Sequence, residues 1–79
     1  MRWSVEQRLR FIESTLAKKG RINRADIMEA FRVSLGQAAH DLAEYRMLAP
    51  GNLNYDASAK AYARAETFEK TFDGKEASK

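Results

Sequence analysis

Hydrophobic residues recur every three or four positions along the first part of the chain, which predicts a helix from about Val5 to Lys19. Its apolar face is formed by Val5, Leu9, Phe11, Ile12 and Leu16. Ser4 is expected to cap this helix, with Gln7 completing a capping box, and Trp3 to pack on the first turn as a hydrophobic staple. Gly20 can take the left-handed conformation that ends a helix.

A second, shorter helix is predicted over about Arg24 to Arg32. Asn23 is a good N-cap, and Asp26 puts a negative charge in the first turn, where the helix dipole favours it. The inward-facing residues of this helix are Ile27, Met28 and Phe31. A turn of about three residues, 32–34, then leads into a third helical pattern. Two short helices joined in this way predict helix-turn-helix geometry.

The third predicted helix, residues 34–46, has two faces of different character. Ser34 can cap it, and Gln37 can close a capping box on the Ser34 backbone N–H. Its apolar stripe consists of Ala38, Leu42 and Tyr45. The residues opposite or beside this stripe are Gly36, Gln37, His40, Asp41 and Glu44. Small and polar first turns suit a DNA recognition helix that enters a major groove, and the alternative is an ordinary amphipathic surface helix.

Strand and turn signals follow the third helix. The sequence A-P-G-N stops the helix, and two short strand-like segments, 53–55 and 61–63, surround a loop of five residues. Ile22 is well placed to pair with this hairpin and to cover the core. Three helices and then a hairpin predict a mainly α fold with a small β-hairpin, a winged helix-turn-helix in which the hairpin is the wing. The three tyrosines are expected to pack in the core or on the hairpin, with their hydroxyls at the surface.

The pattern fades after residue 64, so we expect a winged helix-turn-helix domain over 1–64 and a linker or tail over 65–79. Phe68 and Phe72 are four residues apart, which suits one face of a short helix. As an exposed aromatic pair, they are expected to dock onto a second copy or another domain. The polar end, 73–79, is expected to be disordered.

Composition limits the size and the class of the protein. A chain of 79 residues with 44% hydrophobic content can form one small domain. The absence of cysteine excludes disulfides, thiolate metal sites and a cysteine nucleophile. No apolar run is long enough to span a membrane and no signal peptide precedes the first helix, so we expect a cytoplasmic protein. Residues 1–64 hold eleven Lys and Arg against seven Asp and Glu, a net charge of +4 that suits contact with phosphates.

Catalysis is not expected. The single histidine lacks an acid or nucleophile partner at a recognisable spacing, there is no glycine-rich phosphate loop, and the carboxylates are scattered over helix surfaces. A metal site would need several converging ligands, and His40, Asp41 and Glu44 are only adjacent surface residues. We therefore expect no cofactor and no metal.

Three residues of the third helix are candidates for contact with base edges, namely Gly36, Gln37 and His40. Gln37 can bond to adenine through both ends of its amide, and His40 follows one turn later. The alternative is that Gln37 only closes the capping box and that His40 is a solvated surface residue. Asp41 is expected to hold the helix by a structural contact rather than to read cytosine.

Five residues are candidates for contact with the DNA backbone, namely Ser34, Arg24, Arg46, Ser58 and Lys60. The free N–H groups at the start of the third helix, beside Ser34, favour an anion. Arg24 and Arg46 are placed to clamp phosphates, while Ser58 and Lys60 stand at the tip of the wing, towards the backbone or a minor groove. The alternative is that these cations are solvated or paired with nearby carboxylates.

Five motifs are spaced in an informative way along the chain: F-I-E at 11–13 with Leu16, G-R-I-N-R-A-D at 20–26, S-x-x-Q-A-x-x-D-L-A-x-Y at 34–45, L-A-P-G-N-L at 48–53 and Y-D-x-S-A-K-x-Y at 55–62. Together they resemble the N-terminal winged helix-turn-helix domain of bacterial WYL-domain transcriptional regulators, of the type that represses phage-defence operons. The resemblance covers about residues 3–72. It implies a homodimeric repressor that binds double-stranded DNA at an inverted repeat near its own operon, with the recognition helix in the major groove and the wing beside it.

One departure from that family limits what the resemblance implies. Its members continue into a WYL domain and a C-terminal dimerisation region, whereas this chain stops at Lys79, as an excised domain or a short relative would. Effector sensing is therefore not carried over, and a homodimer would depend on the Phe68 and Phe72 segment. A protein-docking winged helix without DNA binding is the alternative function, and it predicts little affinity for duplex DNA at any salt concentration.

Overall fold

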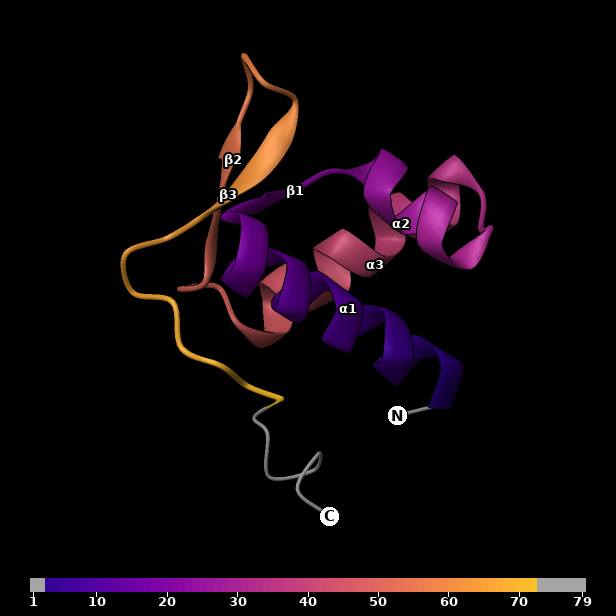
Figure 1. Ribbon diagram of the computed structural model, residues 1–79, viewed down its shortest axis with the longest axis horizontal. Helices are drawn as coiled ribbons and strands as arrows, with labels where there is room; N and C mark the ends of the chain where they lie inside the picture. The colour runs from indigo at the N-terminus through magenta and orange to yellow at the C-terminus, as the bar shows by residue number, and fades with distance from the viewer. Residues whose placement is uncertain (1–2, 73–79) are drawn as a thin grey trace.

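A computed structural model describes residues 3–72 of the chain (Figure 1). In chain order its elements are α1 (Trp3–Lys19), β1 (Arg21–Ile22), α2 (Arg24–Phe31), α3 (Leu35–Leu48), β2 (Leu53–Asp56) and β3 (Ala61–Arg64). The predicted class, a mainly α fold with a small β-hairpin, is confirmed. The predicted disorder of 73–79 lies outside the described residues. No helix in the described part combines the length and the apolar character needed to cross a membrane.

Helix α1 begins earlier than the sequence predicts. It starts at Trp3, so that Ser4 lies inside the helix. The predicted capping box between Ser4 and Gln7 is therefore wrong. Trp3 is 74% exposed, and the predicted staple is wrong as well, because residue 3 lies off the helix face that carries the buried Leu9 and Leu16. The predicted end of the helix is confirmed, since Gly20 has a φ of 82° and its N–H donates to the Leu16 carbonyl.

Helix α2 begins with a complete capping box. The Asn23 side chain accepts from the Asp26 N–H at 2.9 Å, and the Asp26 carboxylate accepts from the Asn23 N–H at 3.0 Å. The helix ends at Phe31, one residue before the predicted end, because Arg32 takes the left-handed conformation with a φ of 57°. Arg32 therefore does in this turn what glycine often does in helix-turn-helix proteins.

Helix α3 runs to Leu48, two residues beyond the predicted end. Ser34 caps it as predicted, because its Oγ accepts from the Gln37 backbone N–H at 3.1 Å. The reciprocal half of the predicted capping box is absent, since the Gln37 side chain turns instead towards Asp41. The two short helices α2 and α3 and the turn between them form the helix-turn-helix.

The three strands form one antiparallel sheet in the order β1-β3-β2. Ile22 pairs with Tyr62, which confirms the predicted contact between the short segment after α1 and the hairpin. Within the hairpin, Leu53 pairs with Arg64 and Asp56 pairs with Ala61. In Figure 1 the hairpin of β2 and β3 extends beyond the helices, as a wing does.

The core lies between the three helices and the base of the sheet. Its fully buried hydrophobic residues are Leu9, Ile12, Leu16, Ile22, Ile27, Ala38, Leu42, Tyr45 and Leu53. The prediction that all three tyrosine hydroxyls reach the surface is wrong for Tyr45, whose hydroxyl hydrogen-bonds to the buried side chains of Glu13 and Asn52. Tyr55 and Tyr62 are neighbours on the hairpin, with their ring centroids 5.0 Å apart.

The segment 65–72 is not helical, so the predicted short helix is wrong. It leaves β3 and passes along the domain towards α1 (Figure 1), where Phe68 and Phe72 are half-buried against the core. Asn52 holds it by two hydrogen bonds to the backbone of Glu69, at 2.8 and 2.9 Å. The predicted exposure of the aromatic pair is therefore wrong, because local periodicity could not reveal these distant partners. Docking by this pair stays a prediction.

Candidate nucleic-acid interface

The outward face of α3 carries small side chains. Gly36, Ala39 and Ala43 follow one another at helical spacing on the side away from the buried Ala38 and Leu42. A Cβ on Gly36 would have a single neighbour within 4 Å, the Ser34 Oγ at 3.9 Å. No packing constraint requires glycine here, and the helix backbone is open to close approach by a ligand.

His40 lies exposed among these small residues, as predicted. Its side chain has no hydrogen bond or ion pair with any residue in 3–72. Met47, one more turn along, is 84% exposed. The outward face therefore offers one imidazole among small or apolar groups, with the half-exposed carboxylate of Glu44 one turn after it, and the small groups leave room for a groove edge.

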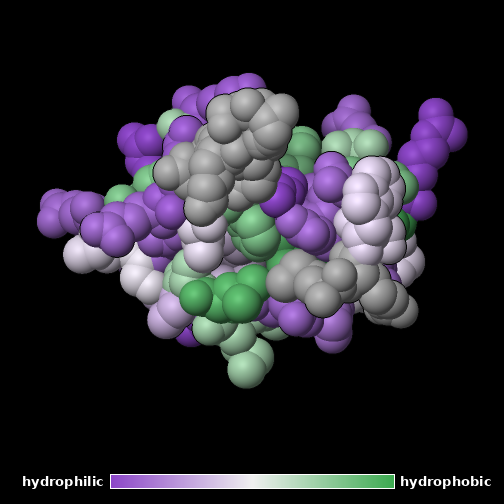
Figure 2. Space-filling model, turned by 90° about the horizontal axis from the view of Figure 1, so that it is seen from below, coloured by the Kyte–Doolittle hydropathy of each residue, from purple (hydrophilic) through white to green (hydrophobic). Residues whose placement is uncertain are grey.

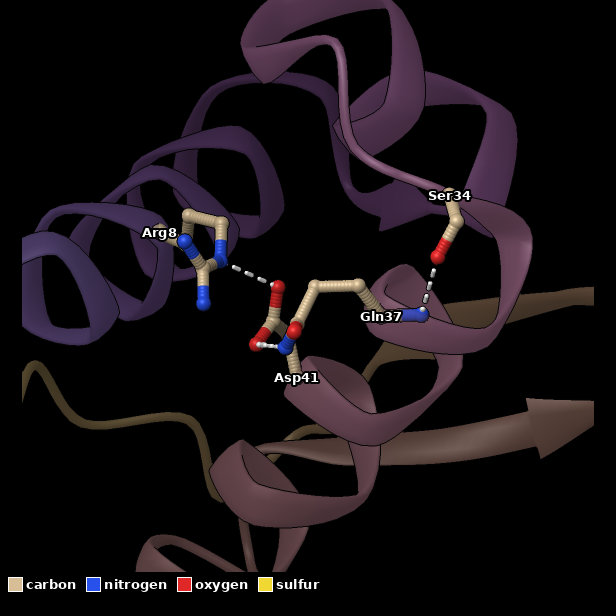
Figure 3. Close-up of polar contacts among 4 residues, drawn as sticks. All are labelled: Arg8, Ser34, Gln37 and Asp41. Carbon is tan, nitrogen blue, oxygen red and sulfur yellow. Dashed lines mark hydrogen bonds and ion pairs between the residues drawn. The ribbon is translucent and has the colours of Figure 1, made fainter.

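Gln37 lies on the flank of α3 that faces α1, beside the outward face rather than at its centre (Figure 3). Its Nε2 donates to Asp41 Oδ1 at 2.9 Å. Asp41 Oδ2 in turn accepts from Arg8 Nε at 2.6 Å, and the Asp41 side chain is buried. The predicted structural role of Asp41 is confirmed, since a buried carboxylate needs such partners. Sequence reasoning did not find Arg8, because it stands 33 residues away from Asp41 and no local pattern connects the two.

Arg24 and Lys60 line one hollow of about 180 Å³ between the start of α2, the middle of α3 and the hairpin. The other lining residues are Asn23, Ala39, Leu42, Tyr55 and Tyr62, so that no carboxylate lines it. Neither cation forms an ion pair within the described part of the chain. The fold thus brings together two predicted backbone contacts that are 36 positions apart, and it gives them a common electropositive recess next to the outward face of α3.

The remaining candidates lie at the two ends of this surface. Arg46 is exposed on the last turns of α3 and lines a separate hollow with Ala43 and Tyr62. At the tip of the wing, Asp56 Oδ1 accepts from the backbone N–H and the hydroxyl of Ser58, at 3.1 and 3.3 Å. The Ser58 hydroxyl is therefore already engaged within the turn, although the residue is exposed.

No set of three or more His, Asp or Glu side chains within 3–72 is arranged to hold a metal ion. The carboxylates of Glu13, Asp26 and Asp41 each accept hydrogen bonds that hold the fold. The charged and imidazole groups of α3 that reach the surface are the exposed His40 and Arg46 and the half-exposed carboxylate of Glu44. The cations of such a surface can hold a polyanion by charge and hydrogen bonds.

Comparison with known families gives a match over residues 4–79 to the winged helix-turn-helix domain of the BrxR transcriptional regulator. The chain is 42% identical over 71 residues to the DNA-binding transcriptional repressor CapW of Escherichia coli (strain KTE188), which covers 90% of this chain. It is also 42% identical over 71 residues to CapW of Pseudomonas aeruginosa, and 43% identical over 68 residues to CapW of Stenotrophomonas maltophilia. The chain spans about a quarter of the length of these relatives, 24%, 24% and 23% in turn.

Proposed function

The chain belongs to the family of BrxR transcriptional regulator winged helix-turn-helix domains, and on this premise we propose that it binds double-stranded DNA in a transcriptional repressor. Relatives named as DNA-binding transcriptional repressors match 86 to 90% of the chain, which supports the proposal. The proposal gives the chain no catalytic role and no cofactor.

The outward face of α3 enters the major groove in this proposal. Small side chains at Gly36, Ala39 and Ala43 let the helix approach the base edges closely, and His40 can bond to a base or a phosphate from the same face. Gln37 can reach a base only from the flank, with its amide held by Asp41. The observation that carries the proposal is the juxtaposition of this face with the electropositive hollow of Arg24 and Lys60.

The DNA backbone is held on either side of the groove. Arg24 and Lys60 bind phosphate at the hollow, and Arg46 binds it from the other end of α3. The N–H groups at the start of α3, next to Ser34, favour an anion through the helix dipole. Ser58 contributes through its position at the tip of the wing, beside the backbone or in the minor groove.

The finer parts of the proposal rest on the family resemblance. They are a homodimer on an inverted-repeat operator, autoregulation of a phage-defence operon and a cytoplasmic location. A dimer would use the surfaces that Phe68 and Phe72 leave exposed, or a region outside residues 3–72.

A fluorescence-anisotropy titration tests the proposal. The protein is titrated against duplex from upstream of its own gene and against a scrambled duplex, at several salt concentrations. We expect tighter binding to the upstream duplex, with an affinity that falls about tenfold or more from low to physiological salt. If the protein binds neither duplex at low salt, the proposal of DNA binding is wrong.

Exposed hydrophobic side chains favour the second candidate function, protein docking. Leu35 and Leu48 are 52% and 45% exposed at the two ends of α3, in addition to Met47. The face shown in Figure 2 has a hydrophobic area, in green, with hydrophilic residues, in purple, along part of its edge. A docking module binds duplex weakly at all salt concentrations, so the same titration separates the two functions.

A further inference from the structure

The hydrogen bond between Gln37 and Asp41 fixes which end of the Gln37 amide is used inside the protein. Both oxygens of Asp41 are acceptors, and Arg8 Nε occupies one of them at 2.6 Å. The other, Oδ1, lies 2.9 Å from Gln37 Nε2. A carboxylate cannot donate, so only the amide nitrogen of Gln37 can face it. Because Asp41 is 1% exposed and held by Arg8, it cannot turn away to release the amide.

The carbonyl oxygen of Gln37 is then the end that remains for a ligand. No donor within 3–72 contacts it, and the residue is half-exposed in the first turns of α3. In the major groove, adenine and cytosine present an amino group, whereas guanine and thymine present a carbonyl oxygen. An amide that offers its oxygen and one remaining N–H matches adenine or cytosine, and it cannot offer guanine two donors.

We propose that Asp41 is a positioning residue that selects the base read by Gln37, by holding the amide so that its carbonyl oxygen accepts from the amino group of adenine or cytosine. This inference rests on the proposed DNA binding. Arg8 takes part in the same arrangement, because its ion pair with Asp41 Oδ2 leaves Asp41 Oδ1 facing Gln37.

The substitution Asp41→Asn makes the proposal specific, because it should reverse the preference. The Arg8 guanidinium has only donors, so the carbonyl oxygen of the new amide must face Arg8 and its NH2 group must face Gln37. Gln37 then accepts through its oxygen, and its own NH2 group is released towards the DNA. That group donates to the carbonyl oxygen of guanine or thymine.

The experiment begins with a duplex selected from a random pool by the unaltered protein. All four base pairs are then tested at every position of the selected site, by anisotropy, with the unaltered protein and with Gln37→Ala. The position at which Gln37→Ala loses discrimination is the one that Gln37 reads. We expect adenine or cytosine to be preferred there by roughly tenfold. Asp41→Asn should prefer guanine or thymine at this position. The double variant, which combines Asp41→Asn with Gln37→Ala, should behave as Gln37→Ala does.

Four results would overturn the inference while leaving DNA binding intact. The first is that Gln37→Ala keeps its discrimination at every position, and the second is that the unaltered protein prefers guanine or thymine at the position that Gln37 reads. The third is that Asp41→Asn keeps the preference of the unaltered protein. The fourth is that Asp41→Asn still changes the preference when Gln37 is replaced by Ala. Failure of the unaltered protein to select or bind any duplex would instead overturn the proposed function and the inference together.

Two further measurements keep the test decisive. Glu29→Gln makes the same change of charge at an exposed position of α2 and should leave the base preference unchanged. Circular dichroism establishes whether Asp41→Asn folds, since it alters a buried group. If that variant does not fold, the preference of the unaltered protein at the Gln37 position decides alone, adenine or cytosine supporting the inference and guanine or thymine overturning it.

Discussion

The hydroxyl of Tyr45 donates a hydrogen bond of 2.7 Å to the carboxylate of Glu13, and both residues are buried. The same carboxylate accepts from the backbone N–H groups of Thr71 and Phe72, at 2.9 and 2.8 Å. Asn52 donates to the Tyr45 hydroxyl at 2.9 Å. This network joins α1, α3 and the segment after the wing.

Burial raises the pKa of Tyr45 to about 12, with the nearby Glu13 carboxylate acting in the same direction. The neutral phenol is thus favoured in the folded state, and this contribution to stability is fully present below the unfolded pKa of about 10. It is lost as the pH rises from about 10 to about 12, by an amount of the order of 2 kcal/mol. Urea unfolding between pH 8 and pH 12 measures it. Tyr45→Phe should lack that part of the pH dependence, and an identical dependence in this variant would contradict the assignment.

Replacement of Glu13 should cost more stability than its small change in shape suggests. Glu13→Gln keeps the volume but loses the charge and turns an NH2 group towards N–H or O–H donors. We expect a loss of about 1–3 kcal/mol in the free energy of unfolding, measured by urea titration. Glu29→Gln, on the exposed surface of α2, should change it by less than about 0.5 kcal/mol. Equal effects of the two variants would argue against the network.

Arg24 and Lys60 should act on the same phosphate, because they line one hollow. The double variant Arg24→Gln and Lys60→Gln should lower the slope of log K against log salt by roughly 0.9, the value for one phosphate. A decrease of roughly 1.8 would mean two separate phosphates, and no decrease would exclude both residues from the interface. Lys18→Gln is the control, since Lys18 lines a different hollow, between α1 and α2.

A negative charge on the outward face of α3 should prevent binding without unfolding the protein. Ala43 is exposed, so Ala43→Glu should leave the thermal midpoint nearly unchanged. Repulsion from phosphates and the added bulk should weaken duplex binding by at least about tenfold. Ala30→Glu makes the same change at an exposed position of α2. Equal losses in both variants would show that only net charge matters, and that α3 is not the reading helix.

The sequence determined the elements that depend on near neighbours. Asn23 and Ser34 cap their helices as predicted, because a cap bonds to an N–H three residues away. Gly20 ends α1 as predicted, because a glycine can take the left-handed conformation that stops a helix without help from other residues. The apolar stripes of α1 and α3 predicted the buried faces, and with them the winged helix.

Only the tertiary structure decided which partners the polar and aromatic side chains contact. Gln37 was expected to turn back on its own cap, but Asp41, fixed by Arg8 from another helix, takes its amide instead. Phe68 and Phe72 were expected on an exposed helix. Their segment instead lies against the core, because its backbone hydrogen-bonds to distant buried side chains, as the Phe72 N–H does to the Glu13 carboxylate. Caps and periodicity act over about four residues, whereas these partners are 33 and 59 residues apart and meet only when the helices pack.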